Sequence, residues 1–468
     1  MVSSVSSLVT GLGTNSGLTN TNASTGTSTG LGQGIDVASF VQLAEAGQQI
    51  QITSLQTQQA AIGKELSTLS PIASDLTALQ STVSALNDPL GVFSSEIATS
   101  SNPNALSATA ASSAVPGAHT ISVTSLATTS SYYSDAVATS STALATGDTF
   151  TISAGLTQVA SVTVDSTNNT LTQIAAAINN QTTAVQASVV QDANGARLAI
   201  VSTASGAPGD LAVTGSLHQI DATAINFHQA VAGLNAVLTV DGVPISSATN
   251  TVSNVINGVT LNLTASTGST PVTLTVAPDT SSISTAINNF VSAYNTAITA
   301  INVQFQVSSG GSAQPLQADG SLRDAQQALL SAITYSVTGS GGPVNLTSLG
   351  INVNNDGTLS VDSGALATAL SSNFSGVQSF LQTASTGFAS NLTSVLKNLN
   401  DPTTGELTLD AQGYAASSTD LTNHISDLQA ALAVQTQNLI AVYARVNTTL
   451  QELPLLQQQL GQQLASIP

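Results

Sequence analysis

The sequence contains no cysteine and no tryptophan, and only 6% of its 468 residues are charged. The absence of cysteine excludes disulfides and thiolate metal sites. An ordinary globular chain carries about 25% charged residues, and here uncharged polar residues and alanine take their place. No stretch approaches the roughly 18 consecutive apolar residues that a membrane helix needs. We therefore expect no membrane-spanning segment, although 41% hydrophobic residues allow a sizeable core.

Positive charge is nearly missing as well. The basic residues number 5 against 24 acidic ones, which gives a formal net charge of −19. They are Lys64, Arg197, Arg323, Lys397 and Arg445. Proteins that bind nucleic acid use Lys and Arg to displace counterions from phosphates, and anionic membrane surfaces attract the same residues. We expect neither nucleic acid nor a membrane as a partner.

The first residues lack the features of a secretory signal. The stretch from Met1 to Ser4 has no basic region and no apolar region follows it directly, so we expect no cleaved signal peptide. The complete lack of cysteine nevertheless suggests a protein that works outside the cell. Residues 1–30 are rich in Ser, Thr, Gly and Asn. Such a segment buries too little apolar surface to order itself, and we expect a flexible terminus.

Heptad patterns mark both ends of the chain and predict long helices. The first stripe consists of Ile62, Leu66, Leu69, Ala73 and Leu76, followed after one slip by Leu79, Val83 and Leu86. Asn87-Asp88-Pro89 is expected to end it. The second stripe consists of Leu421, Ile425, Leu428, Leu432, Gln435, Leu439, Val442 and Val446. It belongs to a helix predicted over residues 420–453, which Pro454 is expected to stop or kink.

The region between the stripes has a different pattern. Residues 93–278 alternate apolar and polar residues in short β-branched runs, which is typical of strands. One helix is predicted within them at residues 170–179, followed by a hairpin turn at residues 192–195. Helices are predicted again at residues 283–294 and 366–399, separated by a second turn at residues 354–357.

Neither terminal stripe is stable alone in water, so both need a partner. We therefore predict an α+β multidomain protein, with an α-helical coiled-coil stalk built from both termini and β-rich head domains inserted at its far end. Periodicity leaves open whether the stripes close one monomer or are shared between subunits. Few charges flank the seam, so polar seam residues such as Gln435 must set its register.

No arrangement of residues points to catalysis. The four histidines, His119, His218, His228 and His424, form no close metal-binding pair. Asp356 with Asp362, or Asp401 with Glu406, provides carboxylates in pairs, but these acids lie beside Asn, Gly, Thr or Pro and are typical of turns. We expect a protein that is not an enzyme and has no catalytic residue, cofactor or metal.

Four stretches of the sequence stand out together. They are residues 30–41, beginning Gly30-Leu31-Gly32-Gln33-Gly34-Ile35-Asp36, residues 87–93 with 98–103, residues 247–261 and residues 290–295. In this order they resemble the amino-terminal signature, the exit from the first long helix, a segment of the head and the return into the helical region of the flagellar hook-associated protein 2 family, the caps of flagellar filaments. In addition, residues 171–198 resemble a module inserted in several flagellar axial proteins.

The resemblance implies a structural cap at the distal end of the bacterial flagellar filament, which retains exported flagellin and promotes its folding and polymerisation. It also implies extracellular localisation at the tip after export by the flagellar type III route. The implied partners are further copies of the chain in a ring, commonly a pentamer, together with flagellin, the hook-filament junction protein and an export chaperone. Adhesion to host surfaces is a possible second role. The alternative is a β-rich surface adhesin with a coiled-coil stalk.

Pattern and resemblance together suggest seven segments. They are a flexible N-terminal leg (1–42), the first part of the stalk (43–90), head domain A in two parts (91–135 and 236–280), head domain B (136–235), the second part of the stalk (281–445) and a C-terminal leg (446–468). For partner binding we single out the turn before the first helix and the end of the second stripe. These residues are Leu31, Gly32, Gly34, Ile35, Asp36, Leu439, Val442, Val446 and Leu450.

Overall fold

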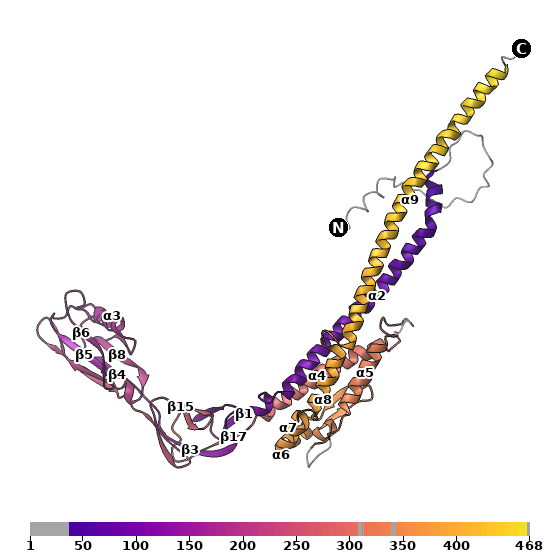
Figure 1. Ribbon diagram of the computed structural model, residues 1–468. Helices are drawn as coiled ribbons and strands as arrows, with labels where there is room; N and C mark the ends of the chain where they lie inside the picture. The colour runs from indigo at the N-terminus through magenta and orange to yellow at the C-terminus, as the bar shows by residue number, and fades with distance from the viewer. Residues whose placement is uncertain (1–36, 308–310, 312, 338–342, 466–468) are drawn as a thin grey trace. The chain divides into compact units, whose positions relative to one another are not determined.

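The computed structural model describes residues 37–307, 311, 313–337 and 343–465 (Figure 1). Its contacts divide the chain into two units. One unit joins α2 (Val37–Asn87), as far as Thr68, to α9 (Glu406–Ala465), from Ala411 onward. The other unit runs from Leu69 to Asp410. The predicted α+β class, with helices from both ends of the chain and inserted β-rich domains, is confirmed.

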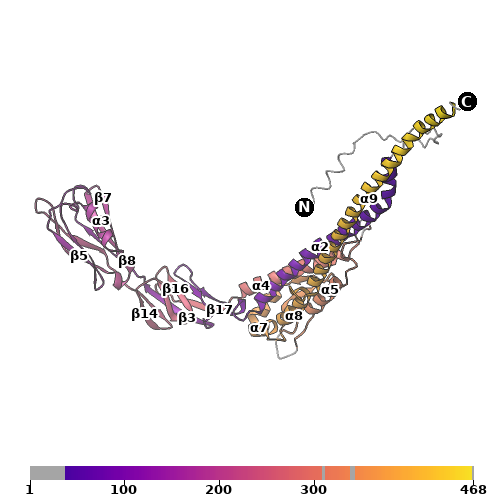
Figure 2. The same cartoon turned by 45° about the horizontal axis from the view of Figure 1, so that its top comes forward.

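In the first unit α2 and α9 lie side by side as an antiparallel pair (Figures 1 and 2). The described apolar contacts along it are sparse. Val41 and Ile52 are buried on α2, and Ile425 is buried on α9. Most other positions are exposed or half-buried, as expected for two helices that cover only one face of each other.

Ile62 and Leu66 of the predicted stripe of α2 are half-buried, and the fully buried part of the stripe differs from the prediction at one position. Ile72 is buried, whereas Ala73 is only half-buried. The slip in the heptad pattern therefore falls between Leu69 and Ile72, earlier than the sequence suggested. Pro71 lies inside the helix at this point. Its missing N–H removes one backbone hydrogen bond, and the stripe changes its phase there. The predicted end of the helix at Asn87 is confirmed.

The helical part of the second unit is built around α4 (Thr280–Gln304). Its buried face carries Ile283, Ile287, Phe290 and Tyr294, as predicted. The elements that follow are α5 (Gly320–Ile333), η3 (Leu346–Leu349), β18 (Ile351–Val353), β19 (Leu359–Val361), α6 (Ser363–Ser372), α7 (Phe374–Gln382) and α8 (Phe388–Asn400). Asp or Asn side chains cap α4, α5, α6 and α7 by accepting hydrogen bonds from backbone N–H groups of the first turn.

The single helix predicted over residues 366–399 is wrong, because the structure has three helices there. Asn373 ends α6 and caps α7 through a hydrogen bond from the N–H of Gly376. A turn at residues 383–387 separates α7 from α8, and a Cβ on Gly387 would lie 2.7 Å from the backbone of Thr383. The breaks let three short apolar faces turn toward one core, which a single straight helix cannot do.

The first β domain packs a five-stranded sheet, in the order β1-β17-β3-β13-β14, against a three-stranded sheet, in the order β15-β16-β2. The strands are β1 (Glu96–Ser100), β2 (Leu106–Ala110), β3 (Gly117–Ser125), β13 (Ala236–Val240), β14 (Val243–Ser247), β15 (Thr251–Ile256), β16 (Val259–Leu263) and β17 (Val272–Pro278). A short helix, η1 (Val92–Ser94), precedes them. Alternating valine, leucine and isoleucine side chains of both sheets form one core.

The second β domain lies within residues 128–235 and has a separate core. It combines the sheets β12-β4-β8-β7, β6-β5-β9 and β10-β11 with one helix. The elements are β4 (Thr129–Ser134), β5 (Thr149–Ala154), β6 (Thr157–Thr163), α3 (Leu171–Gln181), β7 (Val185–Asp192), β8 (Gly195–Ser205), η2 (Ala207–Gly209), β9 (Leu211–Gly215), β10 (Leu217–His218), β11 (Ala224–Ile225) and β12 (Phe227–Val231). The predicted hairpin is confirmed, since Asp192 pairs with Gly195 and Gly195 has a φ of 124°.

The turn between α8 and α9 is held by a carboxylate whose hydrogen bonds depend on pH. Asp401 accepts hydrogen bonds from the N–H and hydroxyl groups of Thr403 and Thr404. These bonds, first among them the one from the Thr403 backbone, lower the pKa of Asp401 from 3.8 to about 2. A depressed pKa gives stability that is present above pH 3.8 and is lost as the pH falls through about 2.

We therefore expect Asp401→Ala to lower the melting temperature at neutral pH. The difference from wild type should shrink as the pH falls from 3.8 to about 2, and circular dichroism melts at 222 nm measure it. A difference that stays constant across this window would contradict the assignment.

Candidate partner-binding surfaces

Polar side chains hold α2 and α9 in register. Nε2 of Gln48 donates to Oε1 of Gln435 at 2.7 Å, and Nε2 of Gln59 donates to Oγ1 of Thr422 at 2.6 Å. The hydroxyl of Thr436 donates to the carboxylate of Glu45. Positions rise along α2 as they fall along α9, so the helices are antiparallel. The prediction that Gln435 sets the register agrees with this hydrogen bond, because misaligning the helices would break it.

The distal end of α9 extends past the beginning of α2. Extrapolated from these contacts, the first residue of α2 lies beside positions near 445 of α9. The helix continues to Ala465, which is about 30 Å further at 1.5 Å per residue. No described residue of α2 can lie beside this stretch. Its leucines are exposed, with Leu456 at 55%, Leu460 at 59% and Leu464 at 63%.

The residues selected on α9 do not all lie in the seam. Leu439 and Leu450 are half-buried, whereas Val442 is 54% and Val446 41% exposed. The half-buried side passes instead through Tyr443 and Asn447, which the sequence analysis missed. A straight α-helix drifts about 20° per heptad from a 3.5-residue repeat. The two valines therefore turn out of the seam and are accessible to a partner.

The other selected residues lie outside the described part of the chain. These are Leu31, Gly32, Gly34, Ile35 and Asp36. The first described residue, Val37, is already helical. Their role in partner binding stays a prediction, as does that of the selected residues of α9.

Pro454 was expected to stop or kink the last helix, and the expectation of a stop is wrong. Pro454 lies inside α9, which ends at Ala465. Proline removes one hydrogen bond and crowds the carbonyl four residues earlier. The leucines and glutamines on either side favour helix, and the helix continues.

The continuation of α9 past Pro454 joins Val442 and Val446 to Leu453, Leu456 and Leu460 along one side of the helix. We call these five residues the distal stripe. The four-residue step from Leu456 to Leu460 was the sequence signal for it.

The titratable groups take structural roles. His119 pairs with Asp241 at 2.8 Å, His228 with Asp135 at 2.9 Å, and His218 with Asp148 at 3.1 Å. Asp356 accepts hydrogen bonds within its turn, and Asp362 caps α6, as the turn interpretation predicts. Within the described ranges, three His, Asp or Glu side chains nowhere gather as a metal ion would require. None of the described helices has the length and apolarity to span a membrane.

Two family models match this chain. The model of the flagellar hook-associated protein 2 N-terminus matches residues 33–130, and the model of its C-terminus matches residues 233–454. The chain belongs to the flagellar hook-associated protein 2 family. The matched parts contain α2, α9 as far as residue 454, and the whole first β domain. The second β domain lies almost entirely between the two matches.

Two relatives in this family are similar to this chain over nearly their whole length. The B-type flagellar hook-associated protein 2 of Pseudomonas aeruginosa is 32% identical over 429 residues, which cover 86% of this chain and 90% of the relative. The flagellar hook-associated protein 2 of Escherichia coli K12 is 31% identical over 422 residues, or 84% and 88% of the two chains.

The fold is similar to a solved member of the family. The crystal structure of the D1-D2-D3 domains of the flagellar cap protein FliD from Escherichia coli matches with a TM-score of 0.55 and 32% identity. The match covers 74% of this chain and 99% of the other. The resemblance noted in the sequence is thus confirmed.

Proposed function

We propose that this chain is the structural cap at the distal end of a bacterial flagellar filament. There it retains exported flagellin and promotes its folding and polymerisation. The observation that carries the proposal is family membership over nearly the whole length of relatives, joined to the fold shared with a flagellar cap protein. Export by the flagellar type III route and a place at the filament tip follow from the same membership.

The distal stripe of α9 supports a contact with the filament end. A helix that presents an exposed apolar stripe binds best to another apolar helix surface. Its partner in this proposal is flagellin, and during assembly the hook-filament junction protein. Charge is sparse along the stripe, so contact depends on apolar burial rather than on ion pairs. Contacts of this kind can break and form again as each flagellin subunit is added.

We also propose two further partners, namely other copies of the chain and an export chaperone. Several copies of the chain form a ring, for which five is the number suggested by the resemblance. An export chaperone holds the chain before secretion. The role is structural and not enzymatic. An adhesive second role has no finding in its support, and the alternative of a stalked adhesin does not account for the match to both family models.

Deleting the gene in its own bacterium tests the proposal. We expect cells with hooks but without filaments, and flagellin monomers in the culture medium. The full chain supplied on a plasmid should restore filaments in electron micrographs, and antibody against the chain should label their tips. Filaments of ordinary length in the deletion strain would overturn the cap function.

A further inference from the structure

The sheet β12-β4-β8-β7 of the second β domain is covered on one face only. Residues of β8 alternate between the two faces. Leu198 and Ile200 belong to the core, where α3 packs. Arg197, Ala199 and Val201 lie on the opposite face, which no described element covers.

Strand register extends this second face across all four strands. Tyr133 lies opposite Ala199 on one side and His228 on the other, and Ser131 lies between Val201 and Val231. Val190 lies opposite Arg197. We call this surface the open face; it consists of Tyr133, Val190, Arg197, Ala199, Val201 and Val231. Four of these side chains are exposed apolar or aromatic groups, namely Tyr133, Val190, Val201 and Val231.

Arg197 gives the open face a positive charge, and no other residue of the two β domains is a lysine or an arginine. It is the only Lys or Arg between Lys64 and Arg323, whereas residues 91–280 contain nine Asp and Glu. Its guanidinium lies 5.7 Å from the ring centroid of Tyr133 and donates to the carbonyl of Ser134 at 3.1 Å. Among the described residues it forms no ion pair with a carboxylate. Arg197 is therefore held over the sheet and can bind a carboxylate of a partner.

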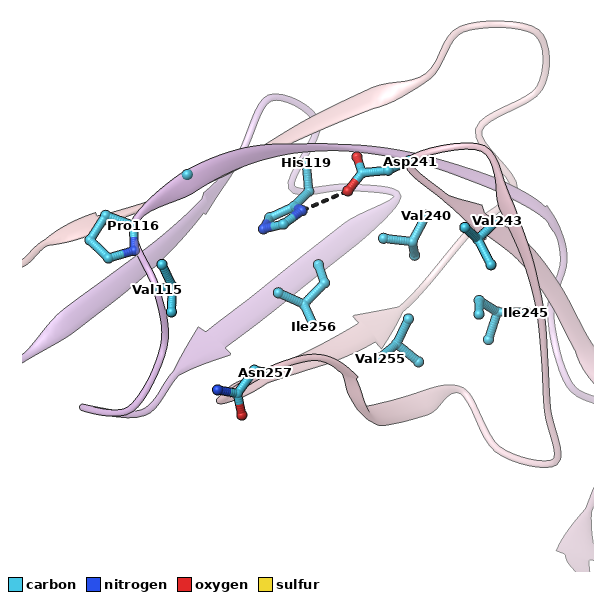
Figure 3. Close-up of a pocket in the computed structure, with 11 residues that line it drawn as sticks. Val115, Pro116, His119, Val240, Asp241, Val243, Ile245, Val255, Ile256 and Asn257 are labelled. Carbon is cyan, nitrogen blue, oxygen red and sulfur yellow. Dashed lines mark hydrogen bonds and ion pairs between the residues drawn. The ribbon is translucent and has the colours of Figure 1, made fainter.

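The first β domain presents a surface of complementary character (Figure 3). A groove of about 450 Å³ opens beside the β13–β14 turn and is lined by Val240, Val243, Ile245 and Ile256. Asp241 lies at its rim, where one oxygen contacts Nδ1 of His119 and the other accepts from the N–H of Thr120. The side chain of Asp241 is 50% exposed. The hydrogen bond with His119, followed by that from Thr120, lowers the pKa of Asp241 and keeps it negative.

We propose that the open face of one chain docks against this groove in a second copy, with Arg197 facing Asp241. This docking mode rests on the proposed function, in which several copies of the chain form a ring, and it names the two surfaces through which neighbouring copies meet. Both β domains are otherwise acidic, so two copies repel each other wherever Arg197 does not meet a carboxylate. The two surfaces differ, so the contact is heterologous. Each copy keeps one open face and one groove for its neighbours, and such contacts close into a ring when the rotation allows.

The apolar part of the contact is tested by adding one charge to the open face. The full-length protein is analysed by sedimentation velocity across a range of concentrations. Val201→Asp should lose the oligomer at concentrations at which wild type assembles, because its carboxylate would be buried without a partner. Leu156→Asp is the matched control. Leu156 lies between β5 and β6 of the same domain and is fully exposed, so the same change there should leave assembly unaltered.

The charged part is tested by a double-mutant cycle. Arg197→Gln and Asp241→Asn should each weaken association by about tenfold, and the double variant should be no weaker than either single one. Asparagine is chosen because residue 241 has a φ of 52°, which asparagine tolerates. Independent effects that multiply in the double variant would overturn the pairing of these two residues.

The outcomes separate this docking mode from the cap function. If wild type forms rings and restores filaments while Val201→Asp does the same, the docking mode is wrong and the cap function stands. If Val201→Asp assembles normally but no longer retains flagellin, the open face binds flagellin and self-docking is overturned. A wild type that neither assembles nor restores filaments would contradict both proposals.

Discussion

Filament growth is expected to stop when two aspartates replace Leu456 and Leu460 on the distal stripe. Both side chains are more than half exposed, and no described residue of α2 reaches them. The substitutions should therefore leave the fold intact. At the filament end the same positions would have to bury two carboxylates against an apolar surface, which is unfavourable without paired charges. Electron microscopy of the complemented deletion strain, with flagellin measured in the medium, gives the readout.

A matched variant distinguishes the loss of the apolar stripe from the effect of the two added charges. Gln458→Asp with Gln462→Asp places the same two charges in the same segment, about 200° around the helix from the leucines. This variant should restore filaments. Circular dichroism of both purified proteins shows whether α9 has been kept. If the leucine variant restores filaments as well as the glutamine variant does, the distal stripe is not a contact surface.

Truncating Phe388 should cause a large loss of stability in the helical part of the second unit. Phe388 is 1% exposed. Its ring lies 5.7 Å from that of Phe290, edge to face, and 5.7 Å from that of Phe380, stacked. Phe388→Ala leaves a cavity among three helices and should reduce the free energy of unfolding by about 3–5 kcal/mol. Urea unfolding followed at 222 nm reports this transition, because nearly all helix lies outside the β domains.

Two controls accompany this measurement. Phe388→Leu keeps most of the volume and should cost clearly less than alanine. Leu409→Ala removes a side chain that is 52% exposed and should change the stability by about 0.5 kcal/mol or less. Equal urea midpoints for Phe388→Ala and wild type would show that this aromatic cluster does not hold the helices together.

Local signals were sufficient for most elements of this fold. The alternation of β-branched residues identified the strands, and Asn87-Asp88-Pro89 identified the helix end at Asn87. These signals act over a few residues and need no tertiary contact. The division of residues 366–399 into three helices was missed, since Asn373 ends α6 and Gly387 precedes α8 only because each helix must turn its apolar face to a shared core.

The candidate surfaces were less accessible to prediction. Heptad spacing placed Val442 and Val446 with Leu439, but the drift of a straight helix turns them outward and brings Tyr443 and Asn447 to the half-buried side. The isolation of Arg197 was visible in the sequence. Its position on an uncovered sheet face was not, because strand order and register join residues far apart in the chain.

The amino-acid sequence by itself determined the net negative charge of the chain and the helical and strand character of its segments. It contains no cysteine, five basic residues and apolar stripes at both ends, and each of these is a property of composition or of short-range spacing. Only the tertiary structure decided which side of α9 meets α2, and which charges lie together, such as His119 with Asp241. These are contacts between residues more than a hundred positions apart, and they form only when the chain folds.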